Sequence, residues 1–385
     1  MDKQLFVTTI PHFSETNLNS FCWFLEYGLS DELRNFASAL NLNEKLNIRV
    51  YSEEFVLKRP KYSSVQCKRY DLTYAIRIYV PIELIEEGTV NEYLAFFGEI
   101  PLMTEEGTFI INGCERVIIN QIIRSPGIYY RRETQEKTLQ YSATLISDRG
   151  SWLKFEFETG TVQIRLNKAT TVDFYHLLET CGITNFDPST KFNLAILNKS
   201  IQQTPISDFD TNLLTKNLTN NQNINFDSKD NYLQIFNEKV YSLGKIGRKK
   251  LNSRLGLSIP DSITRVTIDD VIAISNYLVD LHANLGELDD IDNLRNRRVR
   301  SIGELLQIQY GIGLSRLERS INERLMITNS TAFKVATIIN PKPIIASIKE
   351  FFGSSQLSQF MDQTNPIASL THKRRISSLG PGGLN

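Results

Sequence analysis

Short apolar runs with partial alternation characterise residues 48–82. IRVYSEEFVL and LTYAIRIYVPI are rich in β-branched and aromatic side chains, and this pattern predicts strands. In GTFIINGCERVII, an Asn112-Gly113 pair separates two apolar runs. Asn-Gly is the strongest short signal for a type I′ turn, so we expect a hairpin from about Thr108 to Ile119.

A second strand-rich region is predicted over residues 141–166, YSATLISDRGSWLKFEFETGTVQIRL. Its strands should be broken at Arg149-Gly150 and at Thr159-Gly160. Residues 198–230 are polar and rich in asparagine, and we expect a long loop or a weakly ordered insertion there, with surface helices as the alternative.

After Lys239 the spacing of apolar residues changes to that of a helix. A basic stretch, KVYSLGKIGRKKLNSR, comes first. Thr267 and Asp270 then form a helix start that resembles a capping box, before IDDVIAISNYLVDLH. The residues of that segment that recur at helical spacing are Val271, Ile272, Ser275, Leu278, Val279 and His282.

Two further helices are expected downstream. Ser301 and Glu304 form a capping-box pattern before LLQIQYGIGLSRLERSINERL, and a third helix should follow Pro343 and stop at Gly353. The expected apolar faces are Leu314, Leu317, Ile321 and Leu325 in the first and Ile344, Ile345, Ile348, Phe351 and Phe352 in the second. Sheets and helices without βαβ repetition predict an α+β fold in several domains.

Composition bears on nucleic-acid binding, metal binding and membrane association. The 385 residues suffice for two or three domains, and 43 basic and 43 acidic side chains cancel, so nucleic-acid binding would depend on local clusters. The four cysteines and four histidines are scattered, which predicts reduced thiols and no metal site. No apolar run of membrane-spanning length and no targeting peptide is present, so we expect no membrane association.

Catalytic motifs are absent from the sequence. We find no GxSxG and no HExxH motif, and we expect none of the aspartates to hold the magnesium ions of polynucleotide synthesis. The spacing of Gly244 and Gly247 completes no phosphate-binding loop. We therefore predict no catalytic residue and no metal on this chain.

Two basic clusters are candidates for nucleic-acid contact. The first is DDIDNLRNRRVR, where arginines follow three aspartates; a solvated ion-pair network and a phosphate-binding surface both remain open. The second is His372 to Arg375, with Ser377 and Ser378 beside it. Short polar side chains suited to sugar and phosphate contacts precede it: Gln356, Ser358, Gln359, Asp362, Gln363, Thr364 and Asn365.

Four segments in this order resemble the β subunit of multisubunit bacterial-type RNA polymerase. They are GEIPLMTEEGTFIINGCERVIINQIIRSPGIYY, DDIDNLRNRRVRSIGELL, EFFGSSQLSQFMDQTNP and THKRRISSLGPGGL. The resemblance implies a protrusion at residues 1–123 and 295–357, a lobe inserted at 124–294, and the start of the fork at 358–385. Asn293 and Arg295 depart from the histidine and glycine usual in the family.

The resemblance also implies site residues. The rifamycin pocket of the family would correspond here to Arg116, Gln121, Gln359, Phe360, Asp362, His372, Arg375, Ser377 and Leu379. Gln356 and Gln359 would approach the RNA:DNA hybrid. The residues expected to read non-template DNA are Arg124, Ile291, Asp292, Arg297 and Leu384.

Partners and compartment follow from the same resemblance. We expect a C-terminal section of β, the β′ subunits, an α dimer and a sigma factor, together with DNA and nascent RNA, and Mg²⁺ on β′. The Asn, Ile and Lys content and the plastid-like blocks suggest a plastid enzyme with a split β subunit, with the bacterial cytoplasm as the alternative. A fragment of a longer chain, and a stand-alone nucleic-acid-binding or regulatory module, remain open.

Overall fold

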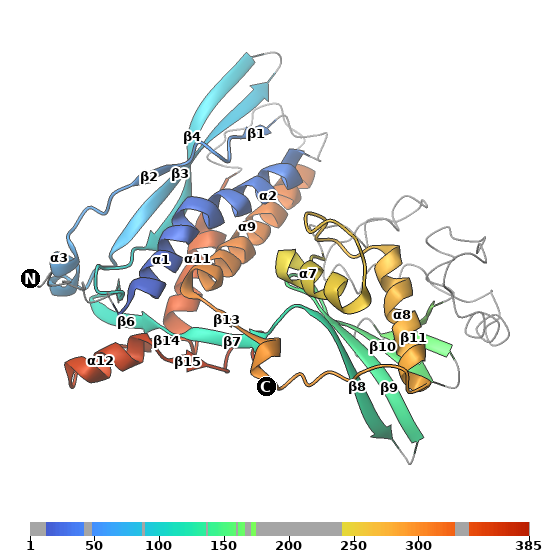
Figure 1. The fold of residues 1–385 in the computed structure, drawn as a ribbon. Coiled ribbons are helices and arrows are strands. Elements are labelled where there is room, and N and C mark those ends of the chain that lie inside the picture. The colour runs from blue at the N-terminus through green and yellow to red at the C-terminus, as the bar shows by residue number, and fades with distance from the viewer. Residues whose placement is uncertain are drawn as a thin grey trace, which may run out of the picture. The chain divides into compact units, whose positions relative to one another are not determined.

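The chain forms two compact units. Our computed structural model describes residues 13–41, 48–86, 89–135, 138–158, 161–165, 171–174, 241–327 and 339–384. Unit 1 comprises Met1–Ile123 and Val299–Asn385, and unit 2 comprises Arg124–Arg298 (Figure 1). Unit 2 is therefore an insertion within unit 1. The names protrusion, lobe and fork remain predictions, as do their boundaries.

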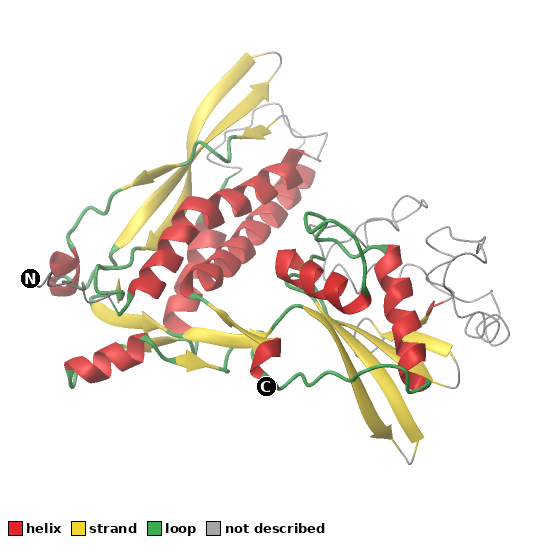
Figure 2. Cartoon of the chain, viewed as in Figure 1, coloured by secondary structure: helices red, strands yellow, loops and turns green. Residues whose placement is uncertain are grey.

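Unit 1 combines helices with small β-sheets that contain antiparallel strand pairs and the parallel pair β7–β15 (Figure 2). Its helices are α1 (Glu15–Trp23), the π-helical turn η1 (Phe24–Gly28), α2 (Leu29–Asn41), α3 (Ser64–Arg69), α9 (Ile302–Ile327), α11 (Lys342–Ser354) and α12 (Pro366–Lys373). Its strands are β1 (Ile48–Val50), β2 (Val56–Lys58), β3 (Ala75–Glu86), β4 (Thr89–Pro101), β5 (Phe109–Ile111), β6 (Cys114–Ile118), β14 (Ser358–Phe360) and β15 (Ile376–Ser377). At the boundary with unit 2 lie β7 (Asn120–Arg124) and β13 (Arg297–Arg300), which share a sheet with β15 in the order β13-β7-β15.

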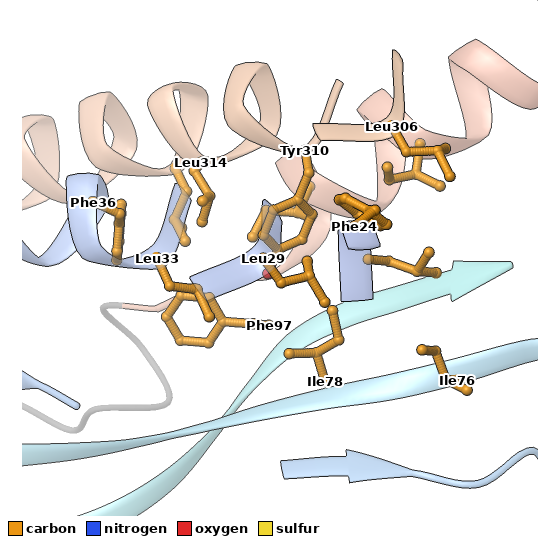
Figure 3. Packing of buried hydrophobic residues seen from close by; sticks show 14 of the residues in the cluster. Phe24, Leu29, Leu33, Phe36, Ile76, Ile78, Phe97, Leu306, Tyr310 and Leu314 are labelled. Carbon is orange, nitrogen blue, oxygen red and sulfur yellow. The ribbon is translucent and has the colours of Figure 1, made fainter. Parts of the chain in front are cut away.

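The core of unit 1 lies between the long β3–β4 hairpin and the helices α2, α9 and α11. Phe36 of α2 meets Phe97 of β4 edge to face, with ring centroids 5.7 Å apart, and Tyr310 and Leu314 of α9 are buried beside them (Figure 3). Full burial of such a side chain contributes about 1.5–3 kcal/mol. Helix α9 can approach α11 closely because Gly313 has no side chain: a Cβ at this position would lie 2.9 Å from the Cα of Ile344.

Most predicted elements of unit 1 are present. Asn112 and Gly113 have φ of 49° and 77° between β5 and β6, which confirms the hairpin and its turn. In α9, Leu314, Leu317 and Ile321 are buried as predicted, while the side chain of Leu325 lies outside the described residues.

The predicted stop of α11 is wrong. The helix includes Gly353 and ends at Ser354, where the extended Ser355 donates its N–H to the oxygen of Phe351. Gly353 is not among the glycines with positive φ, so no left-handed residue terminates this helix.

Unit 2 is an antiparallel sheet with two helices against it. Its strands, in the order β12-β11-β10-β9-β8, are β8 (Gly127–Gln135), β9 (Thr138–Ile146), β10 (Leu153–Glu158), β11 (Thr161–Arg165) and β12 (Thr171–Asp173). Helix α7 (Gly244–Leu255) contacts β8, α8 (Ile268–His282) contacts β9 and β10, and a 3₁₀ turn, η3 (Leu294–Asn296), follows. The second strand-rich region and the α+β class are thus confirmed.

The capping box of α8 is confirmed. Thr267 Oγ1 accepts from the N–H of Asp270, and the Asp270 carboxylate accepts from the N–H of Thr267. Asp270 also pairs with Arg248 of α7 at 2.6 Å, and both side chains are fully buried. Arg248 Nε donates to the oxygen of Ile263 at 2.7 Å, so one guanidinium ties together α7, α8 and the segment between them.

Several predictions cannot be compared with the structure. The asparagine-rich region at 198–230 and the break at Thr159-Gly160 lie outside the described residues. Among the helices that the structure does describe, none is long and apolar enough to span a membrane.

Candidate nucleic-acid interface

Two segments far apart in the sequence, residues 114–124 and 358–377, are joined by strand pairing and carry what we call the candidate face. Strand β14 pairs with β6 so that Phe360 lies opposite Arg116, and β15 runs parallel to β7 so that Ser377 lies opposite Gln121. This pairing brings together the residues that the resemblance implies for the rifamycin pocket. Helix α12 connects the two strands β14 and β15.

Arg116 is held by both polar and aromatic contacts. Its Nη1 donates to the main-chain oxygen of Phe352 at 2.9 Å, and its guanidinium carbon lies 4.2 Å from the centroid of the Phe360 ring. Such a cation–π contact is worth about 0.5–1 kcal/mol at an exposed site. The Phe360 side chain is 62% exposed, so an aromatic ring with a fixed cation beside it faces outward.

His372 organises the turn after β14. Its Nδ1 accepts the main-chain N–H of Asp362 at 3.2 Å, and its Nε2 lies 3.1 Å from Oε1 of Gln359. Because Nδ1 accepts, the neutral ring carries its proton on Nε2 and donates to Gln359. Burial lowers the pKa of His372, as does nearby Arg375, while Asp362 acts in the opposite direction.

The carboxylate of Asp362 is fixed by a neighbour. Oδ1 accepts from Thr364 Oγ1 at 2.7 Å and from the Thr364 N–H at 3.1 Å. The hydroxyl and backbone hydrogen bonds from Thr364 lower the pKa of Asp362, helped by His372 and Arg375. Asp362 therefore presents a stable negative charge beside the exposed Arg375.

Gln121 joins the last described turn to β7. It is fully buried, and its Nε2 donates to the oxygens of Leu379 and Pro381, each at 3.0 Å. Gly380 within this turn has φ of 97°, a conformation that favours glycine. The N–H of Leu384 then donates to the oxygen of Ser378 at 3.1 Å. Gln121 thus shapes this face from beneath instead of contacting a ligand directly.

The remaining predicted residues of this face have local partners. Gln359 Nε2 donates to the oxygen of Gln356 at 3.2 Å, and the hydroxyl of Ser377 accepts the N–H of Leu379 at 3.2 Å. The Leu379 side chain is 46% exposed. All ten predicted pocket and hybrid residues lie on β6, β7 or the segment from Gln356 to Leu379.

Sequence reasoning missed three buried or half-buried supports. Asn17 of α1 donates to the oxygen of Lys373 at 2.9 Å and accepts from Nδ2 of Asn120 at 3.2 Å. Glu115 accepts from Lys68, Gln363 and Thr108, at 3.0, 3.0 and 2.7 Å. The residues beside Asn17 and Glu115 in the sequence give no signal for these roles, because the partners Lys373 and Gln363 lie far away in the sequence.

Glu115 remains ionised despite its burial. Burial raises its pKa, but the hydrogen bonds from Thr108 and Lys68 and the charge of Lys68 outweigh it, and the net pKa is lowered. The carboxylate therefore joins α3 to the segment after β14.

The predicted non-template DNA residues do not form one cluster within a unit. In unit 2, Arg297 pairs with Asp292 at 3.1 Å, and the Arg124 guanidinium lies 5.5 Å from the centroid of the Trp152 ring. Ile291 is 3% exposed and belongs to a buried cluster with Tyr129 and Ile146, so its side chain offers no open surface as folded. Leu384 belongs to unit 1. The DNA contacts of these residues stay predictions.

The arginine-rich segment shows ion pairs. Besides Arg297 with Asp292, Arg298 pairs with Asp148 at 2.9 Å. These contacts favour the ion-pair network for those two arginines, and phosphate binding by the segment stays a prediction. No group of three or more metal-binding side chains occurs in the described part of the chain, and the absence of a metal or cofactor also stays a prediction.

The comparisons with known proteins all indicate one family. Residues 124–300 match RNA polymerase Rpb2, domain 2, and residues 359–385 match RNA polymerase Rpb2, domain 3. The first range nearly coincides with unit 2, and the second covers the segment from Gln359 to Leu384 that carries most of the candidate face.

Full-length relatives extend this match to almost the whole chain. The chain is 46% identical to a DNA-directed RNA polymerase subunit beta of Guillardia theta over 98% of its length, to one of Rhodomonas salina over 99%, and to one of Synechococcus elongatus over 97%. It spans about a third of the length of these relatives, 35%, 36% and 35% respectively. The chain therefore belongs to the family of β subunits of DNA-directed RNA polymerases.

Proposed function

We propose that this chain supplies the N-terminal section of β in a multisubunit RNA polymerase that transcribes DNA into RNA from nucleoside triphosphates. The section would line one wall of the DNA cleft and the RNA:DNA hybrid, at a pocket that rifamycins occupy. One observation supports the proposal: β14 pairs with β6 and β15 with β7, so that Phe360 lies opposite Arg116 and Ser377 lies opposite Gln121.

The chemistry of this face suits a nucleic-acid strand. Phe360 offers an exposed ring for stacking, Arg375 an exposed cation, and Gln356 an exposed amide. The buried His372 ring contacts Asp362 and Gln359, and the buried Gln121 fixes the turn at Leu379 and Pro381. The face binds and positions a strand, and the catalytic Mg²⁺ would be held by β′.

Partners and compartment are part of the same proposal. The chain would act together with the remaining part of β, with β′, with α and with a sigma factor. Relatives in two algae and in cyanobacteria support a plastid enzyme, with the bacterial cytoplasm as the alternative. Affinity purification of the tagged chain from its native source should recover the other polymerase subunits. Recovery of the chain without them, in a form that binds DNA alone, would contradict the proposal.

The pocket is tested separately on the assembled enzyme. Transcription should be sensitive to a rifamycin, and His372→Tyr should relieve the inhibition because the larger ring loses the Nδ1 acceptor for Asp362 and enters the pocket. A matched control is His282→Tyr, at an exposed position of unit 2, which should leave sensitivity unchanged. Wild-type enzyme that is insensitive at saturating drug would count against the pocket but not against the family.

A further inference from the structure

The segment Val56–Tyr70, here termed the α3 surface, carries an unusual concentration of positive charge. Its sequence VLKRPKYSSVQCKRY holds five basic residues and no acidic residue, in a chain whose charges cancel overall. It comprises the edge strand β2, which pairs with β3, and helix α3 after it (Figure 1). Cys67 is its one buried side chain.

Three of the five cations have neither an ion pair nor an aromatic partner among the residues that the structure describes. Lys68 is paired with Glu115, and Lys58 lies over the ring of Tyr79 with Nζ 4.2 Å from the centroid. Arg59, Lys61 and Arg69 are exposed, and none of them forms an ion pair or hydrogen bond to the residues that the structure describes. Unpaired, solvated cations on one short segment attract a polyanion and release its counterions on binding.

Aromatic side chains are interleaved with these cations. Tyr62 is 47% exposed and Tyr70 is 59% exposed, and Val65 between them is 68% exposed. An exposed tyrosine ring offers a flat face on which an unpaired base stacks, whatever its identity. Duplex DNA keeps its bases stacked internally, so this combination suits a single strand.

The surface is held in a fixed conformation. Ser63 and Gln66 form a reciprocal capping box at the start of α3. Two residues after the segment, Leu72 donates its N–H to the oxygen of Cys67 at 2.9 Å and accepts the N–H of Gly113 of the β5–β6 turn at 3.0 Å. A cation array with fixed spacing loses less conformational entropy on binding than a mobile tail does.

The surface also borders the candidate nucleic-acid interface. The Glu115 carboxylate accepts from Lys68 of α3 and from Gln363, which follows β14, each at 3.0 Å. A strand lying on the face that contains Phe360 can therefore continue across this junction onto α3.

We infer that the α3 surface is a second binding site for a single strand of nucleic acid, in which Arg59, Lys61 and Arg69 contact phosphates and Tyr62 and Tyr70 stack on bases. This site is independent of the proposed pocket, and its failure would leave the proposed function standing.

Fluorescence anisotropy with the full chain tests the site. The probes are labelled single-stranded RNA and DNA oligonucleotides of about 15 nucleotides and a duplex of the same sequence. Arg59→Gln, Lys61→Gln and Arg69→Gln, combined, should weaken single-strand binding about tenfold and reduce the slope of log K against log salt by about 2, since each single-strand phosphate contact contributes roughly 0.7. Comparison of the RNA and DNA probes identifies the preferred strand.

The matched control removes the same charge elsewhere. Lys245→Gln, Lys249→Gln and Lys349→Gln, combined, change three exposed lysines on α7 and α11 and should leave affinity and salt slope near the wild-type values. An equal loss in this control, or no loss in the α3 variant, would overturn the inference.

A second pair of variants tests the role of stacking. Tyr62→Ala with Tyr70→Ala should weaken single-strand binding about tenfold at unchanged salt slope. The control is Tyr27→Ala with Tyr93→Ala, two exposed tyrosines outside the surface. Equal binding of duplex and single strand, or displacement of the oligonucleotide by polyglutamate at equal charge, would show a nonspecific polyanion site and would sink the inference.

Discussion

The side-chain amide of Asn17 donates a hydrogen bond to the main-chain oxygen of Lys373, 2.9 Å away and 356 positions later in the sequence. Asn17 is 3% exposed, and its own oxygen accepts from Asn120 at 3.2 Å. Helix α1, strand β7 and the end of α12 therefore meet at one buried amide. His372, the residue before Lys373, depends on this junction for its position.

Replacing this amide should weaken unit 1. Asn17→Ala leaves the oxygen of Lys373 and the amide of Asn120 without their buried partner, and the expected loss is about 1–3 kcal/mol in the free energy of unfolding. Urea denaturation of the full chain measures it. Asn19→Ala, at an exposed position on the same helix, should change stability little. Equal effects of the two substitutions would contradict a specific role for Asn17.

Gln121 should determine the order of the last described turn. Gln121→Glu removes both donors and places a carboxyl group against the oxygens of Leu379 and Pro381. Hydrogen exchange of the Leu384 N–H, which is bonded to Ser378, should accelerate about tenfold or more, the equivalent of at least 1.4 kcal/mol. Gln356→Glu, an exposed position, serves as the control, and unchanged exchange in the Gln121 variant would refute the role.

His372 should titrate below its ordinary pKa of about 6.5. Its lowered pKa means that the unfolded chain binds the proton more readily, so the stabilising contribution is complete above the unfolded pKa and is lost as pH falls toward the folded pKa. Protonated Nδ1 can no longer accept the N–H of Asp362. NMR titration of the imidazole checks the direction of the shift.

Neighbouring charges provide the controls for that titration. Arg375→Gln should raise the pKa of His372, because Arg375 lowers it, whereas Asp362→Asn should lower the pKa further. Shifts in the reverse directions would show that the two side chains do not face His372 as the structure has them.

Substitution in the buried Arg248–Asp270 pair of unit 2 should reduce stability more than substitution of Asn17 does. Arg248→Met leaves Asp270 buried without its counter-charge, and the expected loss is about 3–5 kcal/mol. Adding Asp270→Asn should recover part of the loss by removing that charge. Lys245→Met, exposed on the same helix, should stay within about 0.5 kcal/mol of wild type in the same denaturation experiment. A loss below 1 kcal/mol for Arg248→Met would contradict full burial of the pair.

Local signals in the sequence predicted local structure well. Asn112-Gly113 predicts its turn because two successive left-handed residues admit few side chains, and Thr267 with Asp270 predicts a helix start because both partners lie three residues apart. The stop predicted at Gly353 was wrong because a helix tolerates an exposed glycine, and Gly353 keeps a negative φ within α11.

Long-range partners could not be predicted from the pattern. Arg248 belongs to a basic stretch that looks like a solvated surface, yet its side chain is fully buried against Asp270. Asn17 and Glu115 have ordinary neighbours in the sequence, and their roles arise from contacts made across the fold. The candidate face was identified by resemblance, and its hydrogen bonds became visible once β14 and β15 were placed beside β6 and β7.

Strand β7 connects the candidate face of unit 1 to the first residue of unit 2 along the chain. Gln121, near its start, holds the Leu379–Pro381 turn, and Arg124, at its end, is the first residue of unit 2. The two positions are three residues apart on an extended strand, roughly 10 Å. Strand β7 is hydrogen-bonded to β13 on one edge and to β15 on the other. The strand that carries the buried glutamine is therefore the same continuous strand that ends where the inserted unit begins.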